Sequence, residues 1–367
     1  ALCSCPVTVQ ALSAALEELA GQGRTPFGVY LTSPDYLGGM QDIAALSAVC
    51  DAHGVPLLVD NAHGAYLRFL PGEPLHPIAL GAAMCCDSAH KTLPVVTGGA
   101  YLHLGSKAPV QEEAAVRGAL ALFGSTSPSY LILQSLDACN AVLAGDYPRR
   151  LAQCCAALEG LRRSLNKTAA ARQCPGLQRC CSRLSALRGE LNAAAQAAGC
   201  PVPLALDGPG REPLKLTLDA AALGMTGTAL ADALRGGQLE CEYADPRYVV
   251  LMFTPCNPPE DYARLRTVLR QCLHGLPAAG GLLQPEELAG EFVALAQQAR
   301  AHCTIRQAVF APQERIPVQQ ALGRICAMPT VSCPPAIPIA VSGEEITPAA
   351  LKLMQRYGVT EVSVLRR

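Results

Sequence analysis

The sequence lacks the features of a membrane, secreted or nucleic-acid-binding protein. No apolar run approaches the roughly 20 residues that a membrane-spanning helix needs, and the first residues lack the basic stretch and apolar core of a secretion signal. Only 16% of the residues are charged, and the 29 Lys and Arg nearly balance the 30 Asp and Glu. These absences predict a cytoplasmic protein that binds a small molecule, with no nucleic-acid or membrane partner.

The chain also lacks the cysteine spacing of common zinc and redox motifs. It has 18 cysteines, yet no two are spaced C-x-x-C, which argues against a zinc ribbon and a thioredoxin-type site. Adjacent cysteines such as Cys85 and Cys86 point in different directions on a strand or helix. We therefore expect reduced thiols with mostly structural roles and no metal ion.

The chain does have length and hydrophobic content. Its 367 residues, 50% of them hydrophobic, are enough to bury sizeable cores in two or three domains. After an amphipathic helix over Val9–Leu19, strand-like and helix-like segments alternate, which predicts an α/β fold. The expected elements there are strand Phe27–Thr32, helix Asp42–Ala52, strand Val55–Asp60, strand Ala82–Ser88 and strand Gly98–Leu104.

Two smaller units are predicted downstream. The strand-like segments Leu214–Leu218 and Tyr248–Thr254, with a helix between them and another after, predict a small α+β unit. The stretch "GLPAAGG" is typical of a linker, and a helix over Pro285–His302 opens a third unit. We therefore predict domains at residues 1–146, 147–278 and 279–367. Because the chain starts at Ala1 and enters a helix almost at once, we also expect it to begin in mid-domain.

The segment "LLVDNAHGAYLRF" places a carboxylate, Asp60, at the carboxyl end of a buried-looking strand. Open α/β sheets bind ligands in the crevice beyond such strand ends. A buried carboxylate needs a partner, and the protonated pyridine nitrogen of pyridoxal phosphate is one such partner. The small Ala62 lets a flat ring lie close to the backbone, and His63 can approach the ring's edge.

The segment "DSAHKTLPVVTGGAYLHL", about thirty residues on, places Lys91 after a second strand. Pyridoxal phosphate enzymes bind their cofactor as a Schiff base to a lysine amine. Ser88 and His90 can both donate hydrogen bonds to a phosphate group. The order of strand, aspartate, strand and S-x-H-K indicates a pyridoxal phosphate site much more specifically than any one of these features alone.

At these residues the chain resembles the fold-type-I pyridoxal phosphate enzymes, and within them the bacterial ornithine/lysine/arginine decarboxylases. The motifs that carry the resemblance are "LTSPDYLGGMQDI", "LLVDNAHGAYLRF", "SAHKTLP", "STSPSY", "ERIPVQQALGRICA" and "CPPAIPIAVSGEEI". The last two resemble the C-terminal domain of that family, which ordinary aminotransferases lack. The resemblance implies a large cofactor-binding domain, lacking its N-terminal part here, followed by a small α+β domain and this C-terminal domain.

The resemblance also implies roles for individual residues. Lys91 would form the Schiff base, Asp60 would pair with the pyridine nitrogen and Ala62 would pack under the ring. Ser88 and His90 would bind the phosphate.

A further phosphate contact is implied by "STSPSY". In that loop Ser125 or Thr126 would reach a phosphate, commonly that of the neighbouring subunit, so the resemblance implies a homodimer or a larger homo-oligomer with shared active sites.

The activity implied is decarboxylation of arginine, lysine or ornithine to the corresponding amine, as in polyamine biosynthesis. The catalytic groups would be Lys91, His63 and His90, with Lys91 or a nearby histidine returning a proton to the substrate's Cα.

The chain departs from the family pattern in three places. Asn61 stands where a glutamate is usual, "CPPAIP" replaces a tyrosine-proline-proline-glycine run, and the expected phosphate-binding loop at a helix N-terminus is missing. A fragment, one half of a split enzyme and a catalytically incomplete relative all fit this pattern. Another pyridoxal phosphate reaction, such as transamination, also stays open.

Three further residues are secondary candidates. Tyr36 follows "SPD" either as a turn residue or as a residue near the active site, and we weigh the two equally. His103 lies in a strand and is expected to pack there. Arg247 is expected either to meet a substrate carboxylate or to start a surface strand.

Overall fold

The computed structural model describes residues 7–124, 127–171, 211–220, 225–274, 285–333 and 337–366. The chain divides into two compact units, each described here by itself. The N-terminal unit contains Leu2–Thr217 and Val250–Arg270, and the C-terminal unit contains Leu218–Val249 and Gln271–Arg367. Within the described parts of the chain, no helix is long and apolar enough to cross a membrane.

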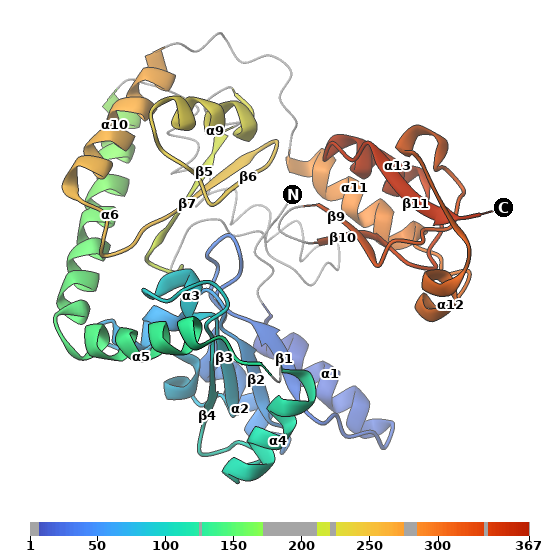
Figure 1. Ribbon diagram of the computed structural model, residues 1–367, viewed down its shortest axis with the longest axis horizontal. Coiled ribbons are helices and arrows are strands. Elements are labelled where there is room, and N and C mark those ends of the chain that lie inside the picture. Colours follow the sequence, from blue (N-terminus) through green and yellow to red (C-terminus); the bar gives the residue numbers. More distant parts are fainter. Residues whose placement is uncertain are drawn as a thin grey trace. The chain divides into compact units, whose positions relative to one another are not determined.

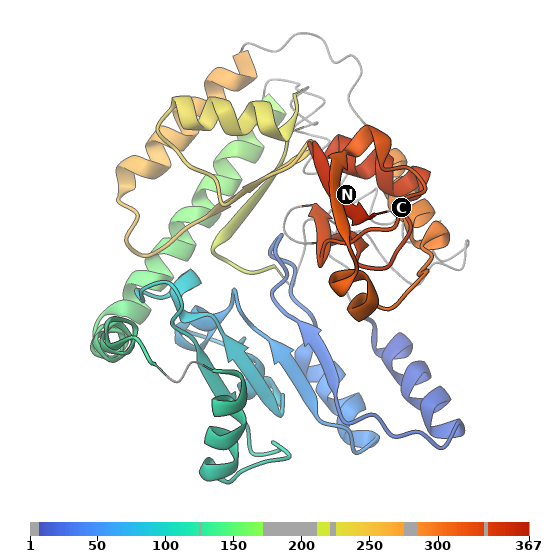
Figure 2. The same cartoon turned by 45° about the vertical axis from the view of Figure 1, so that its right-hand side comes forward.

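A four-stranded sheet forms the centre of the N-terminal unit. Its strand order is β1-β2-β3-β4, and the strands lie side by side in both ribbon views (Figures 1 and 2). The first three strands are parallel and the fourth is antiparallel. The strands are β1 (Val29–Thr32), β2 (Leu57–Asp60), β3 (Met84–Asp87) and β4 (Tyr101–Leu104).

Helices α1 (Val9–Gly21) and α2 (Ile43–Ala52) pack on one face of this sheet. Asp42 starts α2 because its carboxylate accepts the Ala45 amide, which satisfies a backbone donor that the helix leaves unpaired. The fully buried Leu46 and Leu57 belong to the shared core. Each such side chain contributes about 1.5–3 kcal/mol by leaving water.

The expected strands and helices of this region are confirmed, with ends that differ by one to three residues. Short 3-10 helices η1 (Ala65–Phe69) and η2 (Pro77–Leu80) and helix α3 (Ala89–Thr92) connect the strands. Helices α4 (Glu113–Phe123), α5 (Tyr130–Ala144) and α6 (Tyr147–Ala171) follow β4.

A three-stranded sheet of order β5-β7-β6 follows. Its strands are β5 (Lys215–Asp219), β6 (Tyr243–Ala244) and β7 (Tyr248–Met252). Helix α9 (Gly227–Gly236) comes between β5 and β6, and α10 (Pro259–His274) follows β7. This alternation of strand and helix agrees with the α+β pattern expected from the sequence.

The last part of the chain forms its own core. It contains two antiparallel strand pairs, β9-β10 and β8-β11, and the helices α11 and α13, which Figure 1 labels. The buried Ile346, Leu353 and Met354 belong to its core. The elements are α11 (Pro285–Gln298), α12 (Ile305–Phe310), β8 (Gln313–Pro317), η5 (Val318–Gln320), β9 (Thr330–Cys333), β10 (Ile337–Val341), α13 (Pro348–Arg356) and β11 (Glu361–Leu365).

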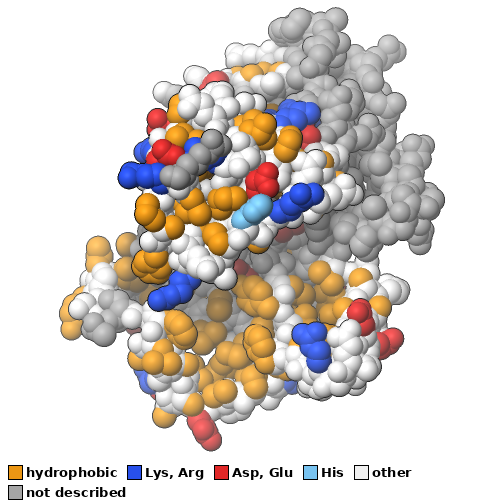
Figure 3. Space-filling model, turned by 90° about the vertical axis from the view of Figure 1, so that its right-hand side faces the viewer, with side chains coloured by type: hydrophobic (Ala, Val, Ile, Leu, Met, Phe, Trp, Pro, Cys, Tyr) orange, Lys and Arg blue, Asp and Glu red, His pale blue; other side chains and the backbone are white. Residues whose placement is uncertain are grey.

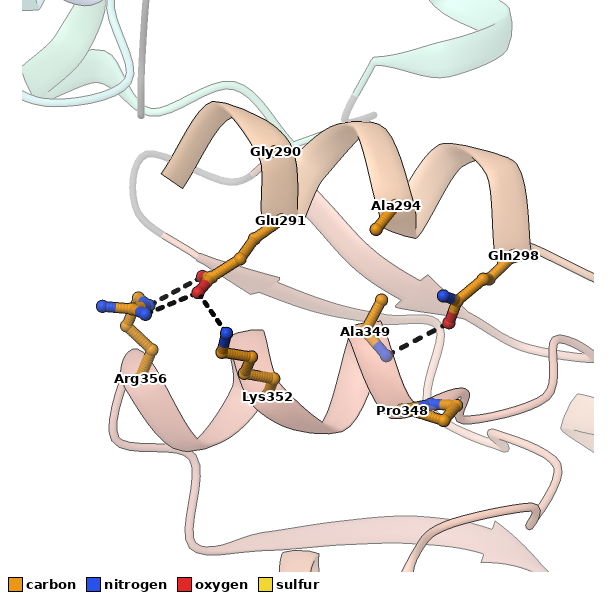
Figure 4. Close-up of a pocket in the computed structure, with 8 residues that line it drawn as sticks. All are labelled: Gly290, Glu291, Ala294, Gln298, Pro348, Ala349, Lys352 and Arg356. Carbon is orange, nitrogen blue, oxygen red and sulfur yellow. Dashed lines mark hydrogen bonds and ion pairs between the residues drawn. The ribbon is translucent and has the colours of Figure 1, made fainter. Parts of the chain in front are cut away.

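A cavity of about 590 Å³ lies between α11 and α13 (Figure 4). The buried Glu291 receives two hydrogen bonds from Arg356, at 2.6 and 2.8 Å, and an ion pair from Lys352 at 3.0 Å. Gln298 accepts the Ala349 amide at 3.3 Å. Because these charges pair with one another, we assign the cavity to the packing of the two helices.

Candidate active site

Two of the sequence-predicted residues meet beyond the ends of β2 and β3. Lys91 Nζ lies 3.3 Å from His63 Nε2. His63 follows β2 by three residues and Lys91 follows β3 by four, and the two strands are parallel. Their carboxyl ends therefore share one edge of the sheet, which is where open α/β sheets bind ligands.

His63 is buried and neutral. Its exposed fraction is 5%. Burial, and then the positive charges of Lys215, Lys91 and His90, lower the pKa of His63 to about 3. A neutral imidazole next to Lys91 can accept a hydrogen bond from the lysine amine, which holds that amine in place. Because its pKa is so low, His63 is too weak a base to take the lysine's proton. The other ring nitrogen, Nδ1, is buried and has no hydrogen-bond partner among the described residues.

The loop before α2 places Tyr36 against His63. The Tyr36 ring contacts the His63 ring edge to face, with centroids 5.0 Å apart. The buried Lys215 of β5 lies over the Tyr36 ring at 5.5 Å and donates to the Asp35 carbonyl at 3.2 Å. Of the two interpretations of Tyr36, the structure therefore favours a place beside the candidate site.

Gly64 explains why the segment reads Asn-Ala-His-Gly. A Cβ on this residue would collide with Asn61 Oδ1 and would lie 2.8 Å from the Pro34 ring. Only glycine therefore lets the chain turn tightly enough after β2 to bring His63 back towards Lys91.

Asp60 is half-buried at the end of β2. One carboxylate oxygen accepts the Ala62 amide at 3.0 Å, and the other accepts the Tyr30 hydroxyl at 3.2 Å. Asp60 lies level with Cys86 in the parallel register, so both side chains belong to the same face of the sheet. Burial, and then the Asp60 charge, raise the pKa of Tyr30.

The remaining predicted residues surround Lys91 or lie outside the described residues. Ser88 caps α3 without a side-chain hydrogen bond to that helix. His90 Nδ1 lies 2.9 Å from the Gly99 carbonyl, which fixes that nitrogen as the protonated one and orients the ring. Ser125 and Thr126 lie outside the described residues, and so does the phosphate contact expected of them.

Two secondary candidates have structural partners. Arg247 makes an ion pair with Asp219 at 2.7 Å and lies over the Tyr248 ring. His103 Nε2 lies 2.9 Å from Asp87 Oδ2. Arg247 is thus engaged within its own sheet, and His103 has a buried carboxylate as its partner.

Sequence reasoning missed Asp87 and Lys215. Asp87 ends β3 just as Asp60 ends β2, so the same pattern could have identified it. Asn61 donates to Asp87 at 2.6 Å, and this hydrogen bond ties the ends of the two strands together. Lys215 stands in the otherwise apolar "LKLTL", and a charge inside a buried strand is the signal that could have found it.

The site has a donor set that fits pyridoxal phosphate. Lys91 offers an amine, Asp60 a carboxylate, and Ser88 a hydroxyl that does not cap its own helix. The unpartnered Nδ1 of His63 is a buried polar atom that a ligand could satisfy. These are the groups that an aldehyde, a ring nitrogen and a phosphate require.

Comparison with known proteins identifies the family. The model "Orn/Lys/Arg decarboxylase, major domain" matches residues 5–261, and "Orn/Lys/Arg decarboxylase, C-terminal domain" matches residues 288–360. An arginine decarboxylase of Bacillus subtilis (strain 168) is 29% identical over 322 residues, which are 87% of this chain and 59% of the relative. An arginine decarboxylase of Bacillus anthracis is 26% identical over 356 residues, which are 95% of this chain and 64% of the relative.

Solved structures agree on the fold. The constitutive lysine decarboxylase of E. coli has a TM-score of 0.66 at 18% identity, covering 97% of this chain and 60% of that one. Lysine decarboxylase A of Pseudomonas aeruginosa has a TM-score of 0.57 at 17% identity, and the match covers 96% of this chain and 56% of that one. The chain thus spans about three fifths of the length of these relatives. It belongs to the Orn/Lys/Arg decarboxylase family and has the fold of the type I pyridoxal phosphate enzymes.

Proposed function

We propose that this chain carries the catalytic core of a pyridoxal phosphate-dependent decarboxylase that acts on arginine, lysine or ornithine. The observation that carries the proposal is the 3.3 Å approach of Lys91 Nζ to the neutral His63, at the sheet edge where this family would bind its cofactor. The proposed product is the corresponding amine, as in polyamine biosynthesis, and the proposed location is the cytoplasm.

The residues present divide the work of holding the cofactor. Lys91 would attach it through its amine, and Asp60 would hold a proton at its ring nitrogen. Ser88 and His90 would bind its phosphate, and Ala62 would lie under its ring. When bound, pyridoxal phosphate draws electrons from the bond between the substrate's Cα and its carboxylate.

The chain's own residues orient the amine and move the proton. The neutral His63 would accept a hydrogen bond from Lys91 at Nε2, which holds the amine in position, because its low pKa keeps the ring unprotonated. Lys91 would afterwards return a proton to the substrate's Cα. The edge-to-face contact with Tyr36 holds the His63 ring in place for this hydrogen bond.

We also propose a homodimer with shared active sites, in which Ser125 or Thr126 reaches the partner's phosphate. Hydrophobic side chains flank that loop on both sides and are largely exposed: Leu122 and Phe123 before it, Tyr130 and Leu131 after it. Groups of exposed hydrophobic side chains are also visible on the face in Figure 3. Large exposed apolar patches mark protein–protein contacts.

We also propose that the domain borders lie at residues 146 and 278, as predicted from the sequence.

A product assay tests the proposal. The purified chain is loaded with pyridoxal phosphate and given arginine, lysine and ornithine in turn, and carbon dioxide, amine and keto acid are measured. We expect carbon dioxide and amine from one of them, and no product from Lys91→Ala. Lys107→Ala is the control, because Lys107 pairs with Asp51 at the surface and should stay active.

The alternatives give different products. Keto acid without carbon dioxide would indicate an aminotransferase. Cofactor binding without any product would indicate a catalytically incomplete relative. The match to the decarboxylase C-terminal domain over residues 288–360 supports the decarboxylase.

A further inference from the structure

A second cluster of reactive side chains lies on the other face of β3 from Asp60. Side chains alternate along a strand, and Cys86 shares the face of Asp60, so Cys85 and Asp87 point to the opposite face. There they meet His76, which precedes η2, and His103 of β4. The reaction proposed above uses none of these four side chains.

His76, Cys85 and Asp87 converge on a small volume, and His103 reaches it through its contact with Asp87. His76 Nε2 lies 3.0 Å and His103 Nε2 2.9 Å from Asp87 Oδ2. Cys85 Sγ lies 3.9 Å from His76 Nε2 and 3.8 Å from Asp87 Oδ1. The ligand atoms of His76, Cys85 and Asp87 all lie within 4.8 Å of one another, and these three residues are buried.

These distances approach those of a tetrahedral zinc site. Zinc bonds of about 2.0–2.3 Å to nitrogen, oxygen and sulfur place neighbouring ligand atoms about 3.3–3.8 Å apart. The observed separations bracket that range, so shifts of a few tenths of an ångström would open the centre for an ion. Two imidazoles, a thiolate and a carboxylate are also the ligand types that zinc prefers.

The surroundings have two further features of a metal site. Asn61 donates to Asp87 Oδ1 at 2.6 Å, which orients the carboxylate with Oδ2 towards the two histidines, as outer hydrogen bonds orient metal ligands. An ion would replace the contacts of the two histidines with Oδ2. The His103 side chain is 38% exposed, which provides an entry path from solvent to the otherwise buried cluster.

We propose that His76, Cys85, Asp87 and His103 bind one zinc ion in a structural site. The ion would join the start of η2 to the strands β3 and β4. The bond to Asp87 would fix the end of the strand that leads into Ser88 and Lys91. The site arises from residues on three segments, so the absence of C-x-x-C spacing does not exclude it. This inference does not depend on the proposed decarboxylase activity.

A simpler arrangement competes with this one. The two histidines could do no more than donate hydrogen bonds to Asp87 and anchor a buried carboxylate. That arrangement needs neither the thiol of Cys85 nor any metal. The two therefore differ in metal content and in the effect of changing Cys85.

Metal content tests the inference. The full chain is produced with Zn²⁺ in the medium and dialysed. Its zinc content per chain is then measured by inductively coupled plasma mass spectrometry. We expect one zinc per chain, a higher melting temperature with zinc than after chelation, and at least a tenfold loss of zinc affinity in Cys85→Ser and His103→Gln. Cys86→Ser is the matched control, because Cys86 is its exposed neighbour on the same strand and points to the other face.

Cobalt gives a second readout. Chain loaded with Co²⁺ should show a thiolate-to-cobalt charge-transfer band that Cys86→Ser keeps and Cys85→Ser loses. Because His103 is partly exposed, His103→Gln should fold even if the buried variants do not. The inference is overturned if the wild type takes up no zinc, or if zinc uptake is the same in Cys85→Ser and His103→Gln as in the wild type.

Discussion

Lys91 Nζ and His63 Nε2 lie 3.3 Å apart, although the two residues are 28 positions apart in the sequence. The neutral imidazole can accept a hydrogen bond from the lysine amine. The chemistry assigned to the site depends on this pair.

Replacing His63 should impair catalysis more than cofactor binding. We expect His63→Gln to lower kcat by about 10²-fold, because misplacing a reacting group by about 1 Å can cost that much and His63 positions the Lys91 amine. The cofactor's absorbance should remain, since Lys91 is intact. Turnover and absorbance titrations measure the two effects separately. Equal losses in both would contradict the assigned role.

The low pKa of His63 should make stability depend on pH. The unfolded histidine binds a proton near pH 6.5 and the folded one only near pH 3. The contribution of His63 to the free energy of unfolding is therefore fully present above pH 6.5. It falls as the pH drops from 6.5 towards 3, by up to about 1.4 kcal/mol per pH unit. Urea unfolding of the wild type and of His63→Gln between pH 4 and 8 measures this slope. The variant should be less sensitive to pH, and an unchanged slope would refute the buried neutral state.

Gly64 should not tolerate a side chain. In Gly64→Ala the new methyl group would collide with Asn61 and crowd Pro34, which should cost about 1–3 kcal/mol. Gly21→Ala is the control, because no heavy atom lies within 4 Å of a Cβ there. Thermal unfolding of the two variants should therefore differ clearly, and similar melting temperatures would argue against the tight turn.

The Glu291 ion pairs should stabilise the packing of α11 on α13 (Figure 4). Arg356→Ala should cost about 1–3 kcal/mol, because it removes two hydrogen bonds from a buried carboxylate and leaves the exposed Lys352 as its remaining ion-pair partner. Lys352→Ala should cost under about 1 kcal/mol, since Lys352 is 64% exposed. Chemical unfolding of both variants measures the difference, and equal costs would contradict it.

The stability contributed by the Glu291 ion pairs should depend on pH. Burial raises the pKa of Glu291, but hydrogen bonds from Arg356 and Lys352 outweigh it and the net pKa is lowered from 4.5. Its contribution to stability is therefore present above pH 4.5 and is lost as the pH falls below that value. Arg356→Ala should lose part of this acid sensitivity, which unfolding at pH 3 to 6 would show.

Local patterns predicted the strands and helices around the candidate site well. Alternating apolar segments gave β1 to β4, and the fold class and family are confirmed. The same patterns predicted Lys91 and His63 as site residues, because both follow strand ends. Their chemical roles stay predictions until measured.

Contacts between distant segments could not be predicted in the same way. The burial of Lys215 and its place over Tyr36 depend on β5 packing beside a loop almost 180 residues earlier. The cluster of His76, Cys85, Asp87 and His103 likewise appears only when three segments come together. Neither follows from spacing, because tertiary packing sets both.

The most direct test of the account is to find which lysine carries the cofactor. The purified chain is incubated with pyridoxal phosphate, the linkage is reduced with borohydride, and the modified peptide is identified by mass spectrometry. The account predicts modification at Lys91, in the peptide that contains "SAHKTLP". Modification at Lys215 instead, or equally at surface lysines such as Lys107 and Lys352, would contradict it.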